Sequence, residues 1–154
     1  MSAQEGPAIA AATDMAWDFP HPHLVEVEAA SGDIDIMGHT NNVVYLRWLE
    51  KAAWAHTKAL GVDWDVYRRL NRAMVARRHE MDYLAACYAG DRILIGTWLK
   101  EPGRLGMRRL YQLIRVQDGR TVMRAATDWV CIRIDSGRPS RMPPEFVAAY
   151  QATC

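Results

Sequence analysis

The sequence of 154 residues lacks the features of several large protein classes. No apolar stretch approaches the roughly 18 residues that a membrane-spanning helix needs, so we expect no membrane partner. Positive charge is not in excess, because 19 lysines and arginines face 18 aspartates and glutamates, for a net charge of +1. This balance predicts no nucleic-acid partner and no membrane-surface partner. The alanine-rich start, Met1 to Ala12, has Glu5 where a secretory signal carries a basic residue. We therefore expect a cytoplasmic protein.

Cysteine is scarce and its spacing is uninformative. The three cysteines are an odd number without CxxC or metal-ligand spacing, which favours reduced thiols over a disulfide framework. The histidines are equally scattered along the chain, so we expect no metal site and no cofactor. These residues are Cys87, Cys131 and Cys154, and His21, His23, His39, His56 and His79.

The length suits one domain with one core, and no internal repeat or linker interrupts it. Residues 1–20 are expected to form a flexible N-terminal leader, and residues 21–154 a single domain.

The first half of that domain predicts one strand and one long helix. Residues 24–29 alternate as a strand does. Residues 43–60 contain neither proline nor glycine and stop before Gly61, which suits the position after a helix C-cap. The charged residues of this helix gather in one narrow stripe and the rest of its circumference is apolar, so a sheet is expected to enclose the helix. The apolar residues are Val43, Val44, Leu46, Trp48, Leu49, Ala52 and Ala53. Asp63 is expected to cap a short second helix that ends at Leu70.

The second half predicts strands separated by turns. Four runs rich in β-forming residues, 74–86, 92–100, 105–116 and 121–135, predict a four-strand antiparallel meander. The dipeptide Asp118-Gly119 between the last two runs is a strong hairpin signal. Pro143-Pro144 is expected to open a short terminal helix. The whole pattern predicts an α+β fold in which a curved antiparallel sheet wraps around a long central helix.

Polar residues are densest in the loop from Gly32 to Asn42, directly before the long helix. A helix N-terminus there supplies unpaired backbone N–H groups and a positive dipole end, and Val44 and Trp48 offer apolar walls. A carboxylate opposite amide donors suits acyl transfer, because one group attacks or activates water while the donors hold the oxyanion.

The same loop and helix resemble the signature of the 4-hydroxybenzoyl-CoA thioesterase family. The matching residues are Asp33-x-Asp35-x-x-Gly38-His39-x-Asn41-Asn42-x-x-Tyr45, continued by Leu46-Arg47-Trp48-Leu49-Glu50. The resemblance extends through Arg78 to Leu84, Gly90-Asp91 and Pro143-Pro144, and so covers roughly residues 23 to 150. It implies the hot-dog fold, a homodimer or homotetramer, and an acyl-CoA thioesterase in which coenzyme A is part of the substrate. The residues after Gly38 are more similar to the broad acyl-CoA and acyl-carrier-protein branches, so the acyl group stays open.

The resemblance also implies roles for individual residues. Asp35 would act as nucleophile or as general base toward water, and the Asn42 backbone N–H would polarise the thioester carbonyl. The residues expected to contact substrate are His39, Asn41, Tyr45, Trp48 and Glu50.

Each of these residues has an ordinary structural alternative. Asp35 could bond its own loop backbone, and Asn41 could cap the helix. Glu50 could pair with Arg47 or Lys51, or could replace Asp35 as the catalytic carboxylate. The arginine pairs Arg77-Arg78 and Arg108-Arg109 are expected to be solvated strand residues, some of them available to CoA phosphates.

Two other functions compete with thioester hydrolysis as interpretations of the sequence. A hot-dog hydratase or dehydratase needs a histidine and an acid placed for proton shuttling, and His39 lacks the proline-rich surroundings typical of those enzymes. A non-catalytic acyl-CoA-binding protein normally carries a DNA-binding appendage, for which this chain has no basic patch.

Overall fold

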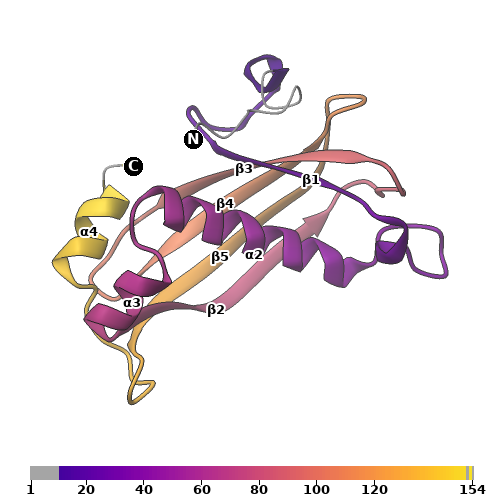
Figure 1. Ribbon diagram of the computed structural model, residues 1–154. Coiled ribbons are helices and arrows are strands. Elements are labelled where there is room, and N and C mark those ends of the chain that lie inside the picture. Colours follow the sequence, from indigo (N-terminus) through magenta and orange to yellow (C-terminus); the bar gives the residue numbers. More distant parts are fainter. Residues whose placement is uncertain (1–10, 152, 154) are drawn as a thin grey trace.

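The computed structural model describes residues 11–151 and 153, which form one five-stranded sheet with a long helix along one face (Figure 1). In chain order the elements are η1 (Ala11–Asp14), β1 (His23–Glu28), η2 (Ser31–Asp33), α2 (Asn42–Ala59), α3 (Trp64–Leu70), β2 (Arg72–Tyr83), β3 (Arg92–Lys100), β4 (Gly106–Arg115), β5 (Arg120–Arg133) and α4 (Pro144–Gln151). The predicted strands, the long helix, the helix capped by Asp63 and the terminal helix are all present within a few residues of their expected bounds.

The strand order corrects the predicted meander. Strands follow the order β1-β3-β4-β5-β2, and all the pairings are antiparallel. Only β3, β4 and β5 form a meander, while β2 pairs with β5 at the opposite edge of the sheet from β1. The reason lies in residues 84–91, which make no hairpin. The Leu84 N–H donates to the Val122 carbonyl on β5, whereas the Gly90 N–H donates to the Ala29 carbonyl beyond β1. The chain therefore crosses the end of the sheet between β2 and β3.

Helix α2 buries one face against the sheet. The residues on that face are Val44, Tyr45, Trp48, Leu49, Ala52, Ala53, His56 and Thr57. The expectation that only a charged stripe stays wet is wrong at Val43, which is 58% exposed, because the sheet covers one side of the helix only (Figure 1). The helix stops where the sequence predicts, since Gly61 adopts a φ of +79° that favours glycine. Within the described residues, no helix is long and apolar enough to cross a membrane.

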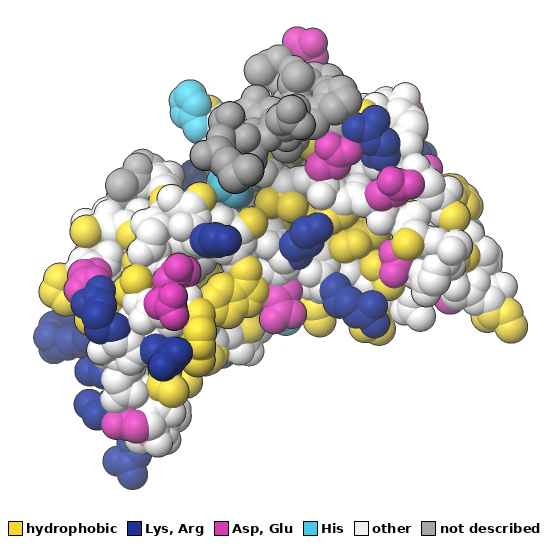
Figure 2. Space-filling view, in the orientation of Figure 1, with side chains coloured by type: hydrophobic (Ala, Val, Ile, Leu, Met, Phe, Trp, Pro, Cys, Tyr) yellow, Lys and Arg dark blue, Asp and Glu magenta, His cyan; other side chains and the backbone are white. Residues whose placement is uncertain are grey.

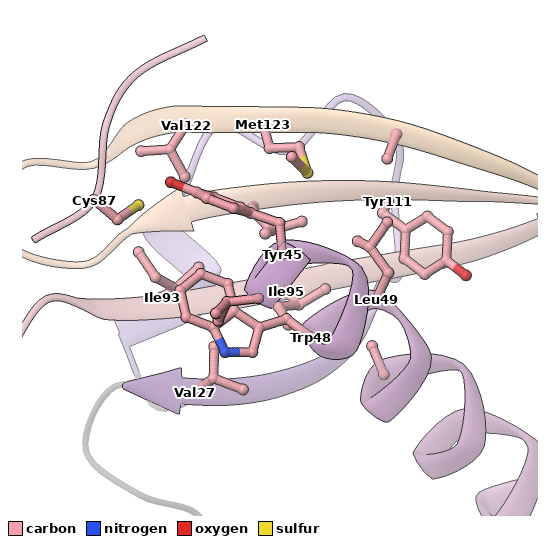
Figure 3. Packing of buried hydrophobic residues seen from close by; sticks show 14 of the residues in the cluster. Val27, Tyr45, Trp48, Leu49, Cys87, Ile93, Ile95, Tyr111, Val122 and Met123 are labelled. Atoms are coloured by element: carbon pink, nitrogen blue, oxygen red, sulfur yellow. The ribbon is translucent and has the colours of Figure 1, made fainter. Parts of the chain in front are cut away.

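Two apolar clusters follow the length of α2. The first lies under its N-terminal half, where Tyr45, Trp48 and Leu49 pack against side chains of β1, β3, β4 and β5 (Figure 3). The second lies at its C-terminal end, where Tyr67 of α3 and Phe146 of α4 pack with Met74 and Met107 of the sheet. Trp54 of α2 reaches the second cluster through its ring contact with Tyr67.

The opposite face of the sheet is covered by part of the expected leader. The Trp17 and Phe19 rings pack edge-on against Trp98, and the Asp18 carboxylate pairs with Arg124 at 2.7 Å. A Cβ on Gly96 would lie 2.6 Å from the Trp17 ring, so the strand needs glycine at this contact. Residues 1–10 of the expected leader lie outside the described residues.

Candidate functional site

The loop before α2 folds into a small hairpin. Ile34 and Thr40 form an isolated antiparallel bridge, and the Asp35 N–H donates to the His39 carbonyl at 2.9 Å. The Gly38 N–H donates to the Asp35 carbonyl at 3.0 Å. Gly38 has a φ of +81°, a backbone conformation that residues with a side chain rarely adopt. The hairpin holds Asp35 directly opposite His39, shortly before the helix begins.

The Asp35 carboxylate is half-buried and held at one oxygen. Its Oδ1 accepts the Met37 N–H at 2.8 Å, so Asp35 does bond its own loop backbone, as aspartates in turns often do. Its Oδ2 has no hydrogen-bond donor among the described residues. The turn therefore fixes the orientation of the carboxylate and leaves one oxygen available. At the tip of the hairpin Ile36 is fully exposed and Met37 is 73% exposed.

Asp33 anchors the loop. Its Oδ2 accepts the Ala30 N–H at 2.9 Å, and its carbonyl accepts the Asn41 N–H at 2.8 Å. The Thr40 N–H donates to the Cys87 carbonyl at 2.8 Å, which ties the loop to the segment that crosses the sheet end. These bonds fix the hairpin relative to the first turn of α2.

The helix start keeps one backbone donor available. Asn41 caps α2, because its Oδ1 accepts the Val43 N–H at 3.0 Å and its carbonyl accepts the Val44 N–H at 2.9 Å. Among the described residues, the Asn42 N–H has no acceptor, and Asn42 is exposed. The Tyr83 hydroxyl donates to the Asn42 carbonyl at 3.0 Å, so β2 also contacts this turn. The donor lies at the positive end of an 18-residue helix.

A cavity of about 340 Å³ lies at this helix start. It is lined by His39, Thr40, Asn42, Tyr45, Tyr83, Leu84, Ala85 and Ala86. The structure thus brings together His39, Asn42 and Tyr45 of the residues expected in the site. The Tyr45 ring is buried with its hydroxyl directed toward Cys87 (Figure 3), and burial raises the pKa of this phenol. Trp48 instead lies in the core, with its ring 5.1 Å from that of Tyr45.

Glu50 lies further along α2 than the residues that line this cavity. It lines a groove of about 300 Å³ between the helix and the sheet, together with Leu46, Trp54, Met74, Val75, Ala76, His79, Tyr111 and Trp129. The expected ion pair of Glu50 with Arg47 or Lys51 does not form among the described residues. Glu50 therefore belongs to a groove wall and not to a surface ion pair.

The prediction of a solvated side chain is wrong for Arg109. This residue is 1% exposed and lies on the same face of β4 as the core residues Met107 and Tyr111. Its neighbour Arg108 does face outward and pairs with Glu80 and Asp128. The alternation of buried positions along β4 was the signal that separates the two arginines.

The Arg109 guanidinium contacts neutral partners. Its Nη1 donates to the Thr97 Oγ1 at 3.1 Å and to the His56 Nδ1 at 2.9 Å. Burial, with the nearby charge of Arg109 and the stacked His23 ring, lowers the pKa of His56 to about 3. His56 is thus neutral near pH 7 and accepts the bond at Nδ1, which places its proton on Nε2. Among the described residues, no group of three or more His, Cys, Asp or Glu side chains could hold a metal ion.

Comparison with known proteins gives a family and a fold. The thioesterase-like superfamily matches residues 30–150. Oleoyl-acyl carrier protein thioesterase 2 from the chloroplast of Arabidopsis thaliana is 27% identical over 112 residues. That match covers 69% of this chain but only 30% of the plant protein, so the chain spans less than a third of the length of that relative.

Solved structures of low sequence identity have the same architecture. The DHNA-CoA thioesterase from Staphylococcus aureus superposes with a TM-score of 0.77 at 21% identity, covering 84% of this chain and 88% of that one. Another Staphylococcus aureus protein, solved in complex with CoA, gives a TM-score of 0.80 at 14% identity, covering 86% and 83%. These superpositions confirm the predicted hot-dog fold.

Proposed function

The chain belongs to the thioesterase-like superfamily, and from this premise we propose that it hydrolyses the thioester of an acyl-CoA or acyl-carrier substrate to a free acid and a thiol. The predicted enzyme class, a thioester hydrolase, agrees with this family. Relatives named for CoA and acyl-carrier-protein thioesters support this choice of substrate class. In the proposal the second substrate is water, coenzyme A enters only as part of the substrate, and no metal or cofactor takes part.

The observation that carries the proposal is the Asn42 N–H without an acceptor, beside a loop that fixes the Asp35 carboxylate. In the proposed reaction this N–H donates to the thioester carbonyl oxygen and holds the negative charge that develops there. The helix dipole adds to the same stabilisation. His39 and Tyr45 line the cavity that receives the thioester.

Asp35 supplies the attack by one of two routes. As nucleophile, its Oδ2 bonds to the carbonyl carbon, the C–S bond breaks, and water then cleaves the resulting anhydride. As general base, it takes a proton from water while the water oxygen bonds to the carbon, and returns that proton to the leaving thiolate. Both routes need the carboxylate ionised and turned toward the cavity.

The test compares Asp35→Asn with Glu50→Gln. Turnover in Asp35→Asn should fall by roughly two to four orders of magnitude, as expected on losing a positioned acid–base group. Glu50→Gln should cost about tenfold or less, since Glu50 lines a groove wall. The measurement is steady-state release of free thiol from a panel of acyl-CoAs, with folding checked by thermal melting.

Two outcomes would contradict this account. Near-normal turnover in Asp35→Asn with collapse in Glu50→Gln would move the chemistry onto the helix. Binding of acyl-CoAs by the wild-type protein without any thiol release would favour a non-catalytic binding protein instead.

We further propose that the active form is a homodimer or a homotetramer. Within the described part of the chain, strand β2 has a partner strand on one side only, and most of its residues from Ala76 to Tyr83 are exposed. A long unpaired edge favours pairing with another chain. Tyr83 on this strand contacts the helix start, so an assembly at β2 would also border the site. Sedimentation equilibrium at micromolar concentration should give two or four subunits, and a monomer would contradict the proposal.

A further inference from the structure

One stripe of α2 residues connects the helix start to its far end. Asn42, Leu46, Glu50 and Trp54 are spaced four apart, so they share one face of the helix. Asn42 lines the cavity at the helix start, and the other three line the middle groove against β2 and β4. Hydrophobic side chains are prominent on the molecular face that α2 crosses (Figure 2).

The stripe ends at a small inner cavity that contains Arg109. This cavity of about 20 Å³ is lined by Ala53, Trp54, Thr57, Tyr67, Met74, Met107, Arg109 and Trp129. Trp54, Met74 and Trp129 line both the inner cavity and the middle groove. The inner cavity and the middle groove are therefore adjacent and share three lining residues. The inner cavity holds about one water-sized group, which suits the end of a chain more than a ring.

Arg109 carries a buried charge for which the described residues supply no counter-charge. Within the described part of the chain, no carboxylate pairs with it, and its Nε is buried without an acceptor. Its two bonds go from Nη1 to Thr97 and to neutral His56. Among the described residues, the indole N–H of Trp129, which lines the same cavity, is also buried without an acceptor. Buried charges are normally paired, because an isolated one is costly.

We propose that Arg109 pairs with a carboxylate at the far end of the acyl group and so selects ω-carboxyacyl thioesters. This inference rests on the proposed thioesterase function and names its substrate class. The acyl chain would run from Asn42 along the stripe, and its terminal carboxylate would accept hydrogen bonds from the guanidinium. Arginine suits this role because its donors match a carboxylate in a dry site.

The geometry also sets the length of the acyl group. Asn42 and Trp54 lie twelve residues apart in α2, which is about 18 Å along the helix axis. An extended chain covers that span in about fifteen bonds, judged from the extension of a polypeptide backbone. Glu50 lines the middle groove, so its charge opposes a carboxylate that stops there. A carboxylate should therefore help a long chain that reaches Arg109 and should penalise a short one.

Other roles for Arg109 fit the structure less well. The phosphates of CoA stay in water, whereas Arg109 lies beneath α2 and is 1% exposed. A purely structural ion pair requires a carboxylate partner, and the described residues supply none. The arginines that do form ion pairs, such as Arg108 and Arg124, lie outside the core.

The first test measures selectivity with matched substrates. Acyl-CoAs of about 8 to 16 carbons, ending in a methyl group or in a carboxylate, are compared by kcat/KM. In the wild-type protein the carboxylate should favour the longer substrates. In Arg109→Met the ratio of carboxylate-ended to methyl-ended kcat/KM should fall by about a hundredfold or more, as for loss of a buried charge partner. Arg124→Met, an exposed arginine on the opposite face of the sheet, should leave the ratio unchanged.

The second test separates this proposal from catalysis. Non-hydrolysable thioether analogues of the same CoA compounds are titrated by calorimetry into the wild-type protein, Arg109→Met and Arg109→Lys. The ω-carboxylate should tighten binding in the wild-type protein, lose that effect in Arg109→Met, and recover part of it in Arg109→Lys. Arg109→Met should also keep or raise the melting temperature, because it removes an unpaired buried charge.

The outcomes are distinct. If no acyl-CoA releases thiol, the proposed function fails, while the titrations still decide the role of Arg109. A preference for methyl-ended chains of every length in the wild-type protein would overturn the Arg109 proposal. Equal stabilisation of the wild-type protein by chloride or acetate, lost in Arg109→Met, would overturn it too, since the site would then hold a free anion.

Discussion

At the start of α2 the polar groups are exposed or half-buried and are held by backbone hydrogen bonds, whereas at its end they are buried and are held by side-chain hydrogen bonds. The hairpin around Asp35 bonds to its own backbone and leaves the Asn42 N–H open to a ligand. Arg109 of β4 and His56 on the buried face of α2 are instead 1% and 6% exposed and bond to each other. The first arrangement suits chemistry with water, and the second suits recognition of a group brought in from outside.

The largest stability effect is expected from His56 as the pH falls. Its pKa is lowered to about 3 in the folded protein, mainly by burial, from about 6.5 in an unfolded chain. Between these values the unfolded chain binds a proton that the folded protein does not, so acid favours unfolding. Stability present above pH 6.5 should fall by about 1.4 kcal/mol per pH unit toward pH 3.

The pH dependence is checked by urea unfolding of the wild-type protein and His56→Gln between pH 4.5 and pH 7.5. In His56→Gln the free energy of unfolding should fall much less steeply as the pH is lowered. In His21→Gln, which changes an exposed position, it should fall as steeply as in the wild-type protein. His23 contributes in the same direction, because burial and the Arg109 charge lower its pKa too. An unchanged slope in His56→Gln would show that the imidazole is not held neutral by its surroundings.

A smaller effect on the free energy of unfolding is expected at the start of α2. Asn41→Ala removes the side-chain cap of α2 and should lower the free energy of unfolding by about 1 kcal/mol. Asn41→Asp keeps an acceptor oxygen at the same place and should retain nearly all of the stability. Chemical denaturation of the three proteins provides the measurement. Equal stability of Asn41→Ala and the wild-type protein would mean that the exposed hairpin alone orders the helix start.

The helix start was predictable because its residues are contiguous. The spacing of Asp35, Gly38 and Asn42 ahead of a helix without proline or glycine gave both the loop and the helix bounds. The cap at Asn41, the glycine after the helix and the Asp118-Gly119 hairpin follow from local backbone chemistry. Caps and turns of this kind depend on a few residues adjacent in the chain, so they can be predicted from the sequence.

The far end was not predictable, because it depends on contacts between distant segments. Arg108 and Arg109 are adjacent on one strand, so alternation places them on opposite faces of the sheet. Which of the two faces α2 depends on how the sheet packs against the helix, and the sequence of β4 alone does not determine that. The pairing of β2 with β5 was not predicted for the same reason. The residues after β2 do not determine which strand lies beside it. The ring stack of His23 on His56 likewise joins residues from two elements.

A single assay compares the two ends of α2. Thiol release is measured for one long acyl-CoA and its ω-carboxylated counterpart, using the wild-type protein, Asp35→Asn and Arg109→Met. We predict that Asp35→Asn lowers turnover of both substrates alike, by roughly two to four orders of magnitude, and leaves their ratio unchanged. Arg109→Met should change the ratio and retain turnover of the methyl-ended substrate. Near-normal turnover in Asp35→Asn would contradict the central claim that the thioester is cleaved at the helix start.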